Sequence, residues 1–380
     1  MMLAGFATSV LFARFFDKEI YGQYQLVLSF IAFFSFFSVP GLNPALIRST
    51  AKGNDGDFKR SVKQALKFSP LGSLFLLGIA VYYFFNSEEI VAYALLLSAV
   101  FFPFLFSFDK WQAFLKGKEQ FETFTKQNIL VTTGKTVLIV SSIILFPDYL
   151  LPVITAYLVG ISFFHLLLYL RTKKKTKNNL KGEDTLKYAG FITKLGVLNT
   201  LVNHFDKILI GISDIKMLAV YAIALGLINI IKNFIKSVTA ITFPKFAKHN
   251  ISLSVKQVLL LLFSGIILSA VLFFLSDELV KILYTEKYLR SAHYFKLFVL
   301  IIPLFIISSV LSKKVLARKQ KRILIHLKVT VPVITLAFSV IVYILTQKIE
   351  YFIFAKYFCF NILNFIILII PEKKNNLKNL

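Results

Sequence analysis

The chain has 380 residues, of which 57% are hydrophobic and 42 are phenylalanine, and its mean hydropathy is +0.73. This apolar content exceeds the roughly 45–50% of a soluble domain, and it falls into about a dozen continuous blocks, which excludes a transmembrane β-barrel because barrel strands alternate in polarity. The net charge of +25 is better explained by basic loops of a membrane protein than by nucleic-acid binding.

Twelve apolar segments have lengths that suit helices crossing the roughly 30 Å hydrocarbon core of a bilayer. In chain order they are 1–16, 21–47, 68–85, 90–108, 128–146, 150–170, 188–210, 217–243, 257–275, 293–311, 323–345 and 350–370. The sequence therefore predicts an all-α polytopic membrane protein with about 12 transmembrane helices. The first segment is short for a bilayer, so we expect a truncated first helix and a missing native N-terminus, with local thinning of the bilayer as the alternative.

Lysine and arginine are distributed unequally between the two sets of predicted loops. Of the 44 in the chain, 30 fall in the segments 48–67, 109–127, 171–187, 245–256, 313–328 and 371–380, and eight fall at or near the opposite ends of the predicted spans. Cytoplasmic loops carry the excess of basic residues in membrane proteins. The pattern therefore predicts that both chain termini are cytoplasmic.

The basic segment 171–187 divides the predicted helices into six and six. We expect residues 1–170 to form an N-terminal six-helix lobe, 188–370 a C-terminal six-helix lobe, and 371–380 a cytoplasmic tail, with 171–187 as the cytoplasmic linker. A soft internal match supports two halves in the same orientation, as in parallel repeats. The matching segments run from Tyr24 to Lys52 and from Tyr221 to Lys248.

Six lysines lie inside predicted spans, where an ionisable group costs at least about 2.5–3.5 kcal/mol at the bilayer centre. They are Lys135, Lys194, Lys232, Lys236, Lys296 and Lys356. The last two lie near span ends, which suits snorkelling to the interface.

The stretch LINIIKNFIKSV carries a polar stripe inside an apolar span. Asn229, Lys232, Asn233 and Lys236 follow the spacing i, i+3, i+4, i+7 and therefore share one helical face. We expect this face to line a cavity, because ionisable residues in spans usually face a bundle interior. Snorkelling or helix packing is the alternative.

A second stripe lies in the seventh span, where Asn199, Asn203 and Asp206 share a face. Asp206 is expected to pair with a nearby lysine, and an ion-coupling site for a proton or sodium is the alternative. His165 and His204 are interpreted as hydrogen-bonded structural residues. An interior with several lysines and one aspartate favours an anionic ligand.

The sequence contains no carboxylate pair, catalytic triad, glycine-rich phosphate loop or histidine cluster. Its single cysteine, Cys359, permits neither an internal disulfide nor a cysteine-based zinc cluster. We therefore expect no catalytic residues, no cofactor and no metal.

Several short motifs occur in a characteristic order along the chain. They are Ala13-Arg14, Tyr21-Gly22-Gln23-Tyr24, Gly41-Leu42, Ile47-Arg48, the loop at 111–124, HFDKILIG at 204–211 and AVYAIAL at 219–225. With these motifs the chain resembles, over nearly its whole length, the polysaccharide-transporter family. That family comprises the Wzx-type O-antigen and capsule flippases of the multidrug/oligosaccharidyl-lipid/polysaccharide exporter superfamily.

The resemblance implies a non-enzymatic flippase in the bacterial cytoplasmic (inner) membrane, with two lobes in a V that alternates its opening. Its substrate would be an undecaprenyl-pyrophosphate-linked oligosaccharide, moved to the outer leaflet for O-antigen, capsule or exopolysaccharide synthesis. A polysaccharide polymerase and chain-length proteins are the further partners expected. The alternatives are a peptidoglycan-precursor flippase or drug exporter of the same superfamily, a polysaccharide-modifying membrane enzyme, and a structural scaffold.

For such a flippase we expect ten residues to line the substrate cavity. Arg14, Arg48, Lys135, Lys194, Lys232 and Lys236 would neutralise the pyrophosphate, and Asn199, Asn203, Asn229 and Asn233 would hydrogen-bond the sugars. Lysine binds phosphate as a point charge. An inside-negative potential would favour outward movement of such an anion by about 2.3 kcal/mol per charge per 100 mV.

Overall fold

The computed structural model describes residues 2–240, 254–317 and 320–377, and every regular element in these ranges is a helix. The contacts divide the chain into two compact units, which we call unit 1 (Met1–Ala219) and unit 2 (Val220–Leu380). Each unit is described by itself. The predicted all-α class is confirmed.

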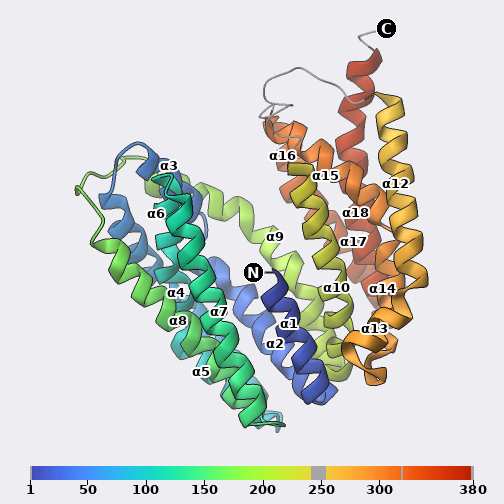
Figure 1. Cartoon of the computed structure of the whole chain (residues 1–380), viewed down its shortest axis with the longest axis horizontal. Coiled ribbons are helices and arrows are strands. Elements are labelled where there is room, and N and C mark those ends of the chain that lie inside the picture. The colour runs from blue at the N-terminus through green and yellow to red at the C-terminus, as the bar shows by residue number, and fades with distance from the viewer. Residues whose placement is uncertain (1, 241–253, 318–319, 378–380) are drawn as a thin grey trace. The chain divides into compact units, whose positions relative to one another are not determined.

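Unit 1 contains the helices from α1 to α9 and the first residues of α10 (Figure 1). Their bounds are α1 Met2–Phe15, α2 Lys18–Phe34, η1 Ser35–Ser38, α3 Leu42–Ala51, α4 Gly56–Phe85, α5 Glu89–Ser107, η2 Phe108–Lys110, α6 Trp111–Gly117, α7 Phe121–Leu145, α8 Leu150–Lys173, α9 Thr185–Ser213 and α10 Ile215–Ala240. Helix α7 packs against α1 and α8, and α9 packs against α2 and α3.

Unit 2 contains the rest of α10 and the helices that follow it (Figure 1). Their bounds are α12 Val255–Phe274, α13 Ser276–Tyr284, η3 Glu286–Tyr288, α14 Arg290–Val299, α15 Ile302–Ala317, α16 Lys321–Ile325, the π-helical turn η4 His326–Thr330, α17 Val331–Thr346 and α18 Ile349–Leu377. Helix α15 packs against both α12 and α18, and α17 packs against α18.

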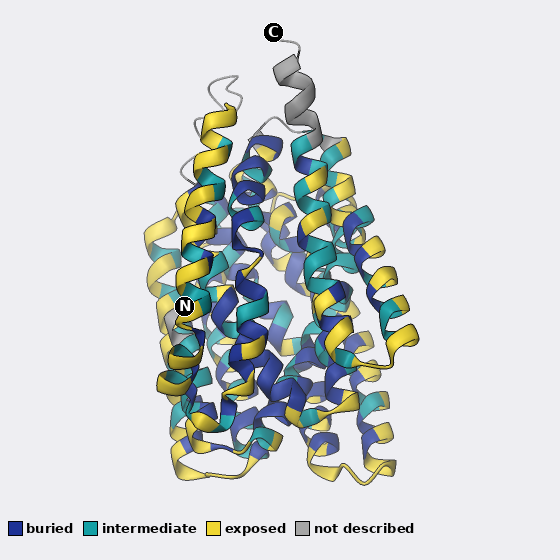
Figure 2. Ribbon diagram, turned by 90° about the vertical axis from the view of Figure 1, so that its right-hand side faces the viewer, coloured by how far each residue is buried: buried dark blue, intermediate teal, exposed yellow. Residues whose placement is uncertain are grey.

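The long helices expose large apolar side chains that a soluble protein would bury. In α12, Leu259, Leu260 and Phe263 are 57%, 68% and 63% exposed. Figure 2 shows exposed residues along the sides of many helices and buried residues between them. A helix that is apolar where it is exposed is stable in lipid, where its backbone groups are satisfied within the helix. The chain is therefore a multi-pass membrane protein.

Among the described residues, nine helices are long and apolar enough to cross a membrane, or ten if α14 and α15 form one bent span. The predicted count of about 12 is therefore not confirmed. Helix α1 has only 14 residues. Helix α9 is long enough, but Lys194, Asp206 and Lys207 raise its polarity.

Two predicted spans differ from the observed helices at their ends. The predicted span 21–47 is wrong as one helix, because the chain leaves the helical path at Val39, which has a left-handed backbone (φ 54°), and at Pro40. The observed span there is Lys18–Ser38. Helix α4 starts at Gly56 rather than near 68, since its first turns are polar but still helical.

The grouping of α9 differs from the predicted lobes. The sequence assigned 188–210 to the C-terminal lobe, whereas the contacts place α9 in unit 1 and the unit boundary inside α10. The division of the chain at 171–187 into two six-helix repeats stays a prediction. Lys248, the end of the second repeat, lies outside the described residues.

The basic segment 171–187 is held against the turn between α3 and α4 by two buried carboxylates. The Asp57 Oδ2 atom accepts hydrogen bonds from Ser49 Oγ (2.5 Å), Thr185 Oγ1 (2.6 Å) and the Gly182 backbone N–H (2.8 Å). Asp55 forms an ion pair with Lys118 (2.5 Å) and accepts from the Lys177 backbone N–H (2.8 Å).

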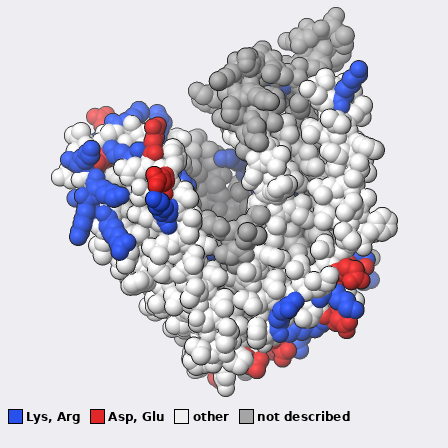
Figure 3. All heavy atoms as spheres, viewed as in Figure 1, with Lys and Arg blue, Asp and Glu red and all other residues white. Residues whose placement is uncertain are grey.

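Lysine and arginine side chains gather around this turn. Figure 3 shows them in blue over the end of unit 1 that carries α3 and α6. This is the end of unit 1 that the distribution of basic residues predicts to be cytoplasmic.

Candidate functional site

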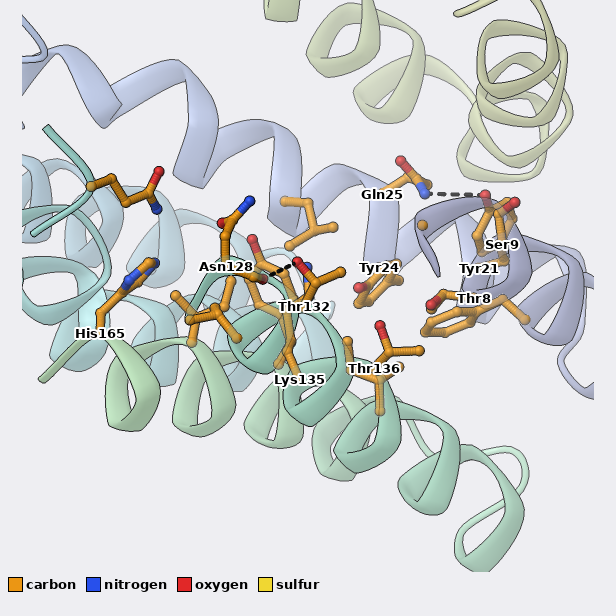
Figure 4. A pocket seen from close by; sticks show the side chains of 18 residues that line it. Thr8, Ser9, Tyr21, Tyr24, Gln25, Asn128, Thr132, Lys135, Thr136 and His165 are labelled. Carbon is orange, nitrogen blue, oxygen red and sulfur yellow. Dashed lines mark hydrogen bonds between the residues drawn. The ribbon is translucent and has the colours of Figure 1, made fainter. Parts of the chain in front are cut away.

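Unit 1 contains a cavity of about 400 Å³ inside its helix bundle. Helices α1, α2, α7 and α8 form most of its wall, and Gln112 of α6 adds to it (Figure 4). Its polar lining residues are Thr8, Ser9, Tyr21, Tyr24, Gln25, Gln112, Asn128, Thr132, Lys135, Thr136, Tyr157 and His165. Hydroxyl, amide and phenol groups thus dominate its polar lining.

Lys135 is the cation in this lining, and no described residue that lines the cavity is acidic. Its ammonium group lies 5.6 Å from the centroid of the Tyr157 ring, a distance at which a cation is attracted to the ring face. Helix α8 packs closely against α7 at Gly160, where an added Cβ would lie 3.5 Å from the Lys135 Cα. This packing brings the Tyr157 ring of α8 near the Lys135 ammonium of α7. Lys135 was predicted as a cavity residue.

His165 forms one end of the cavity wall and has a defined hydrogen-bond partner (Figure 4). The buried Trp111 donates from its indole Nε1–H to His165 Nδ1 over 3.1 Å. His165 is therefore hydrogen-bonded, as the sequence predicts. The sequence did not predict that it also lines a cavity.

Lys232 and Lys236 of the predicted stripe contact aromatic rings inside unit 2. The Lys232 ammonium lies 4.3 Å from the Tyr357 centroid and 5.1 Å from the Phe305 centroid. The Lys236 ammonium lies 5.8 Å from the same Phe305 ring. Within the part of the chain that the structure describes, neither lysine forms an ion pair with a carboxylate. Two ammonium groups thus converge on one neutral ring.

Tyr357 is positioned by the bend between α14 and α15. The two helices meet at 50°, and two carbonyl groups at the end of α14 accept side-chain hydrogen bonds there. The Tyr357 hydroxyl donates to the Phe298 carbonyl (3.1 Å), and Ser269 Oγ donates to the Val299 carbonyl (2.7 Å). The bond from the Tyr357 hydroxyl therefore holds the ring that lies beside Lys232.

The other two residues of the α10 stripe, Asn229 and Asn233, are exposed, as is Lys236, whereas Lys232 is half-buried. In the α9 stripe, Lys194 and Asn203 are exposed and Asn199 is half-buried. Asp206 is buried, at 3% exposure.

The two arginines of the predicted set lie apart from these groups. Arg14 is exposed at the end of α1. Arg48 lies 5.2 Å from the Tyr188 ring and lines a second cavity of about 300 Å³ at the linker. Within unit 1, the structure therefore separates Arg48 from the Lys135 cavity.

The arrangement of these helices is a fold also found in a solved flippase and in solved multidrug transporters. The chain is similar to a lipid II flippase, MurJ, in an inward closed conformation, with a TM-score of 0.72, 15% identity, and coverage of 98% of this chain and 85% of that chain. It is also similar to a multidrug resistance MATE family transporter in an inward-facing conformation, with a TM-score of 0.67, 11% identity, and coverage of 99% and 94%. At these identities the likeness shows the fold alone.

The family described as polysaccharide biosynthesis protein matches residues 1–250, and the chain belongs to that family. A MOP superfamily transporter from Pyrococcus furiosus, described by a reverse polarity of its binding pocket, is also similar, with a TM-score of 0.57, 13% identity, and coverage of 99% of this chain and 91% of that chain. Among curated proteins, none matches the chain at a significant level.

Proposed function

We propose that this protein is a flippase for lipid-linked oligosaccharides, with an undecaprenyl-pyrophosphate-linked repeat unit as its substrate. The protein would move the pyrophosphate and sugars from the cytoplasmic to the outer leaflet while the polyprenyl tail stays in lipid. The bacterial cytoplasmic membrane is the proposed location, with both termini cytoplasmic. A polysaccharide polymerase and its chain-length proteins are the proposed partners.

The observation that carries this proposal is the convergence of Lys232 and Lys236 on Phe305. An ammonium group inside a membrane span costs several kcal/mol unless it is compensated. Aromatic faces offer only about 0.5–2 kcal/mol per cation. A bound phosphate group supplies the missing negative charge, so the two lysines suit a dianionic headgroup.

The remaining predicted residues keep supporting roles in this proposal. The stripes on α9 and α10 present amide groups of Asn199, Asn203, Asn229 and Asn233, which suit sugar hydroxyls. Lys194, Arg14 and Arg48 would attract the anionic headgroup as it enters or leaves. Asp206 is the candidate for ion coupling, because a buried carboxylate in a span is an expected proton or sodium site.

The double substitution Lys232→Gln with Lys236→Gln tests the proposal. Each ammonium–phosphate contact contributes roughly 1.5–3 kcal/mol, so losing both lowers transport at limiting substrate by at least about 100-fold. The measurement is the share of lipid-linked oligosaccharide that an impermeant oxidant reaches at the outer face of cells lacking the native protein.

Lys281→Gln with Lys348→Gln is the matched control. Both lysines are exposed in unit 2, where Lys281 pairs with Glu286 and Lys348 contacts the Tyr351 ring. The control should transport at the wild-type rate. Wild-type transport by the Lys232/Lys236 variant, at equal protein level, would refute the role of these lysines.

The alternatives within the superfamily differ in cargo and are separated by complementation. A strain lacking its peptidoglycan-precursor flippase and a strain lacking its glycan-repeat flippase each receive this protein. If only the strain that lacks its peptidoglycan-precursor flippase is rescued, the substrate is a peptidoglycan precursor and not the proposed glycan repeat unit. Export of a cationic dye without any glycan phenotype would instead indicate a drug exporter.

A further inference from the structure

We propose that the cavity in unit 1 is a binding subsite for an acidic sugar, of the hexuronate class, within the transported glycan. This inference rests on the proposed flippase function and adds the chemistry of one sugar in its cargo. The site is the cavity around Lys135 and His165, which belongs to unit 1 alone.

The lining suits a polyhydroxylated ligand. Twelve of its residues carry a polar group and only one of these is a permanent charge, so the site offers hydrogen bonds rather than a strong field. Thr132 Oγ1 donates to the Asn128 backbone carbonyl, and Gln25 Nε2 donates to the Tyr21 hydroxyl (Figure 4). These bonds fix the Thr132 hydroxyl and the Gln25 amide at the cavity wall.

An aromatic wall completes the pocket. The rings of Phe12 and Tyr24 are 4.3 Å apart between centroids, and Tyr157 meets Tyr24 edge-on at 6.5 Å. Such faces pack against the C–H groups of a pyranose ring, whose hydroxyls then point to the polar lining. A volume of about 400 Å³ holds a unit of one or two sugars rather than a whole oligosaccharide.

Lys135 determines which charge the cavity prefers in a sugar. The lining holds this cation and, among the described residues, no acidic partner for it. A neutral sugar would leave the ammonium uncompensated at a half-buried position, whereas a carboxylate on the sugar neutralises it through a charge-assisted hydrogen bond.

His165 provides a neutral donor at the other end. Because Trp111 donates to Nδ1, that nitrogen carries no proton, and the neutral imidazole must hold its hydrogen at Nε2. His165 is therefore a positioned Nε2–H donor for a sugar oxygen. Lys135 and His165 together impose an orientation on a ligand that has a carboxylate at one end and hydroxyls at the other.

The chain carries its own reporter for this site, because Trp111 is its single tryptophan and hydrogen-bonds the cavity wall. The experiment titrates the detergent-purified full chain with glucuronate, glucose and inorganic phosphate while recording tryptophan emission. We expect a saturable change with glucuronate at a concentration about tenfold lower than with glucose, because a charged hydrogen bond is added. Phosphate should not displace it.

Two variants of α7 and two of α8 identify the groups responsible. Lys135→Gln should remove the preference for glucuronate, and Lys126→Gln, an exposed lysine paired with Glu122 on the same helix, should keep it. His165→Gln keeps a donor near the Nε2 position and should bind both sugars as the wild type does, whereas His165→Leu should weaken both. Melting curves identify any variant that fails to fold. For such a variant, the binding test is replaced by a transport assay with the wild-type protein, in which free glucuronate should compete with the glycan.

Equal binding of glucose and glucuronate, displacement by phosphate alone, or no saturable change in the wild type would each overturn the acidic-sugar subsite. The flippase proposal fails separately, when wild-type protein translocates no lipid-linked glycan of any composition. Transport of a neutral glycan that free glucuronate does not inhibit would overturn the subsite and leave the flippase proposal standing.

Discussion

Replacing Asp57 with alanine should release the basic segment 171–187 from the α3–α4 turn. The Asp57 carboxylate is fully buried and accepts three hydrogen bonds, of which those from Gly182 and Thr185 come from the segment or its junction with α9. Ser49 supplies the third. Alanine leaves all three donors without this acceptor in a site that excludes water.

The magnitude follows from the loss of a buried charged acceptor. Removing one partner from such a network costs about 3–5 kcal/mol, and each 1.4 kcal/mol is a tenfold change in an equilibrium constant. If this free energy is lost from the local opening equilibrium of the segment 171–187, the population of molecules with the segment open rises at least about 100-fold. Asp57→Asn retains one acceptor oxygen and should show a smaller rise.

Limited trypsin digestion measures this opening, because the segment holds Arg171, Lys173, Lys174, Lys175, Lys177, Lys181 and Lys187. When opening and closing are fast, cleavage tracks the open population, so the Asp57→Ala variant should be cut at least about 100-fold faster there. Glu183→Gln changes an exposed charge in the same segment and should be cut at the wild-type rate. An Asp57→Ala protein that folds and resists trypsin as the wild type does would refute the anchoring role.

Two further substitutions test packing within each unit by thermal unfolding in detergent. Gly22→Ala should destabilise unit 1 by about 1–3 kcal/mol or more, since its Cβ would lie 2.0 Å from the Ile215 backbone oxygen; Gly226→Ala, with open space around its Cβ, should be neutral or slightly stabilising. Ser269→Ala should cost about 1–3 kcal/mol by leaving the Val299 carbonyl without its side-chain donor. Its control is Ser264→Ala, because Ser264 is exposed and bonds only within α12, so this change should hardly alter the free energy of unfolding. For either pair, an equal loss of stability in the test variant and in its control would contradict the explanation given.

Hydropathy predicts the helices well because lipid requires backbone groups to be satisfied within each span. It predicts their ends poorly. Helix α4 begins twelve residues before the predicted start at 68, and these first turns are a polar stretch that contains Asp57, Lys59 and Arg60. Those turns remain helical while their side chains bond the linker, and hydropathy contains no information about that contact.

The candidate site shows the same division between charge and packing. Lys135 and Lys232, which are half-buried, could be predicted from the sequence because a charge in an apolar block is conspicuous, whereas Lys236 of the same predicted set is exposed. The hydroxyl and phenol groups around Lys135 could not, because residues such as Thr132 and Tyr157 are common in spans and often bond their own helix. They form a cavity only through the packing of α1, α2, α7 and α8.

The fold is shared by transporters of different cargo, so selectivity must come from interior chemistry. A monovalent cation brought to about 5 Å from one ammonium meets a repulsion of about 3 kcal/mol at an effective dielectric constant of 20, and a phosphate oxygen gains about the same. In the described part of unit 2, Lys232 and Lys236 add this effect twice with no ion-paired carboxylate to offset it. For the proposed flippase function, the sign of these two side chains, rather than the arrangement of helices, is therefore what would favour an anionic headgroup over a cationic drug.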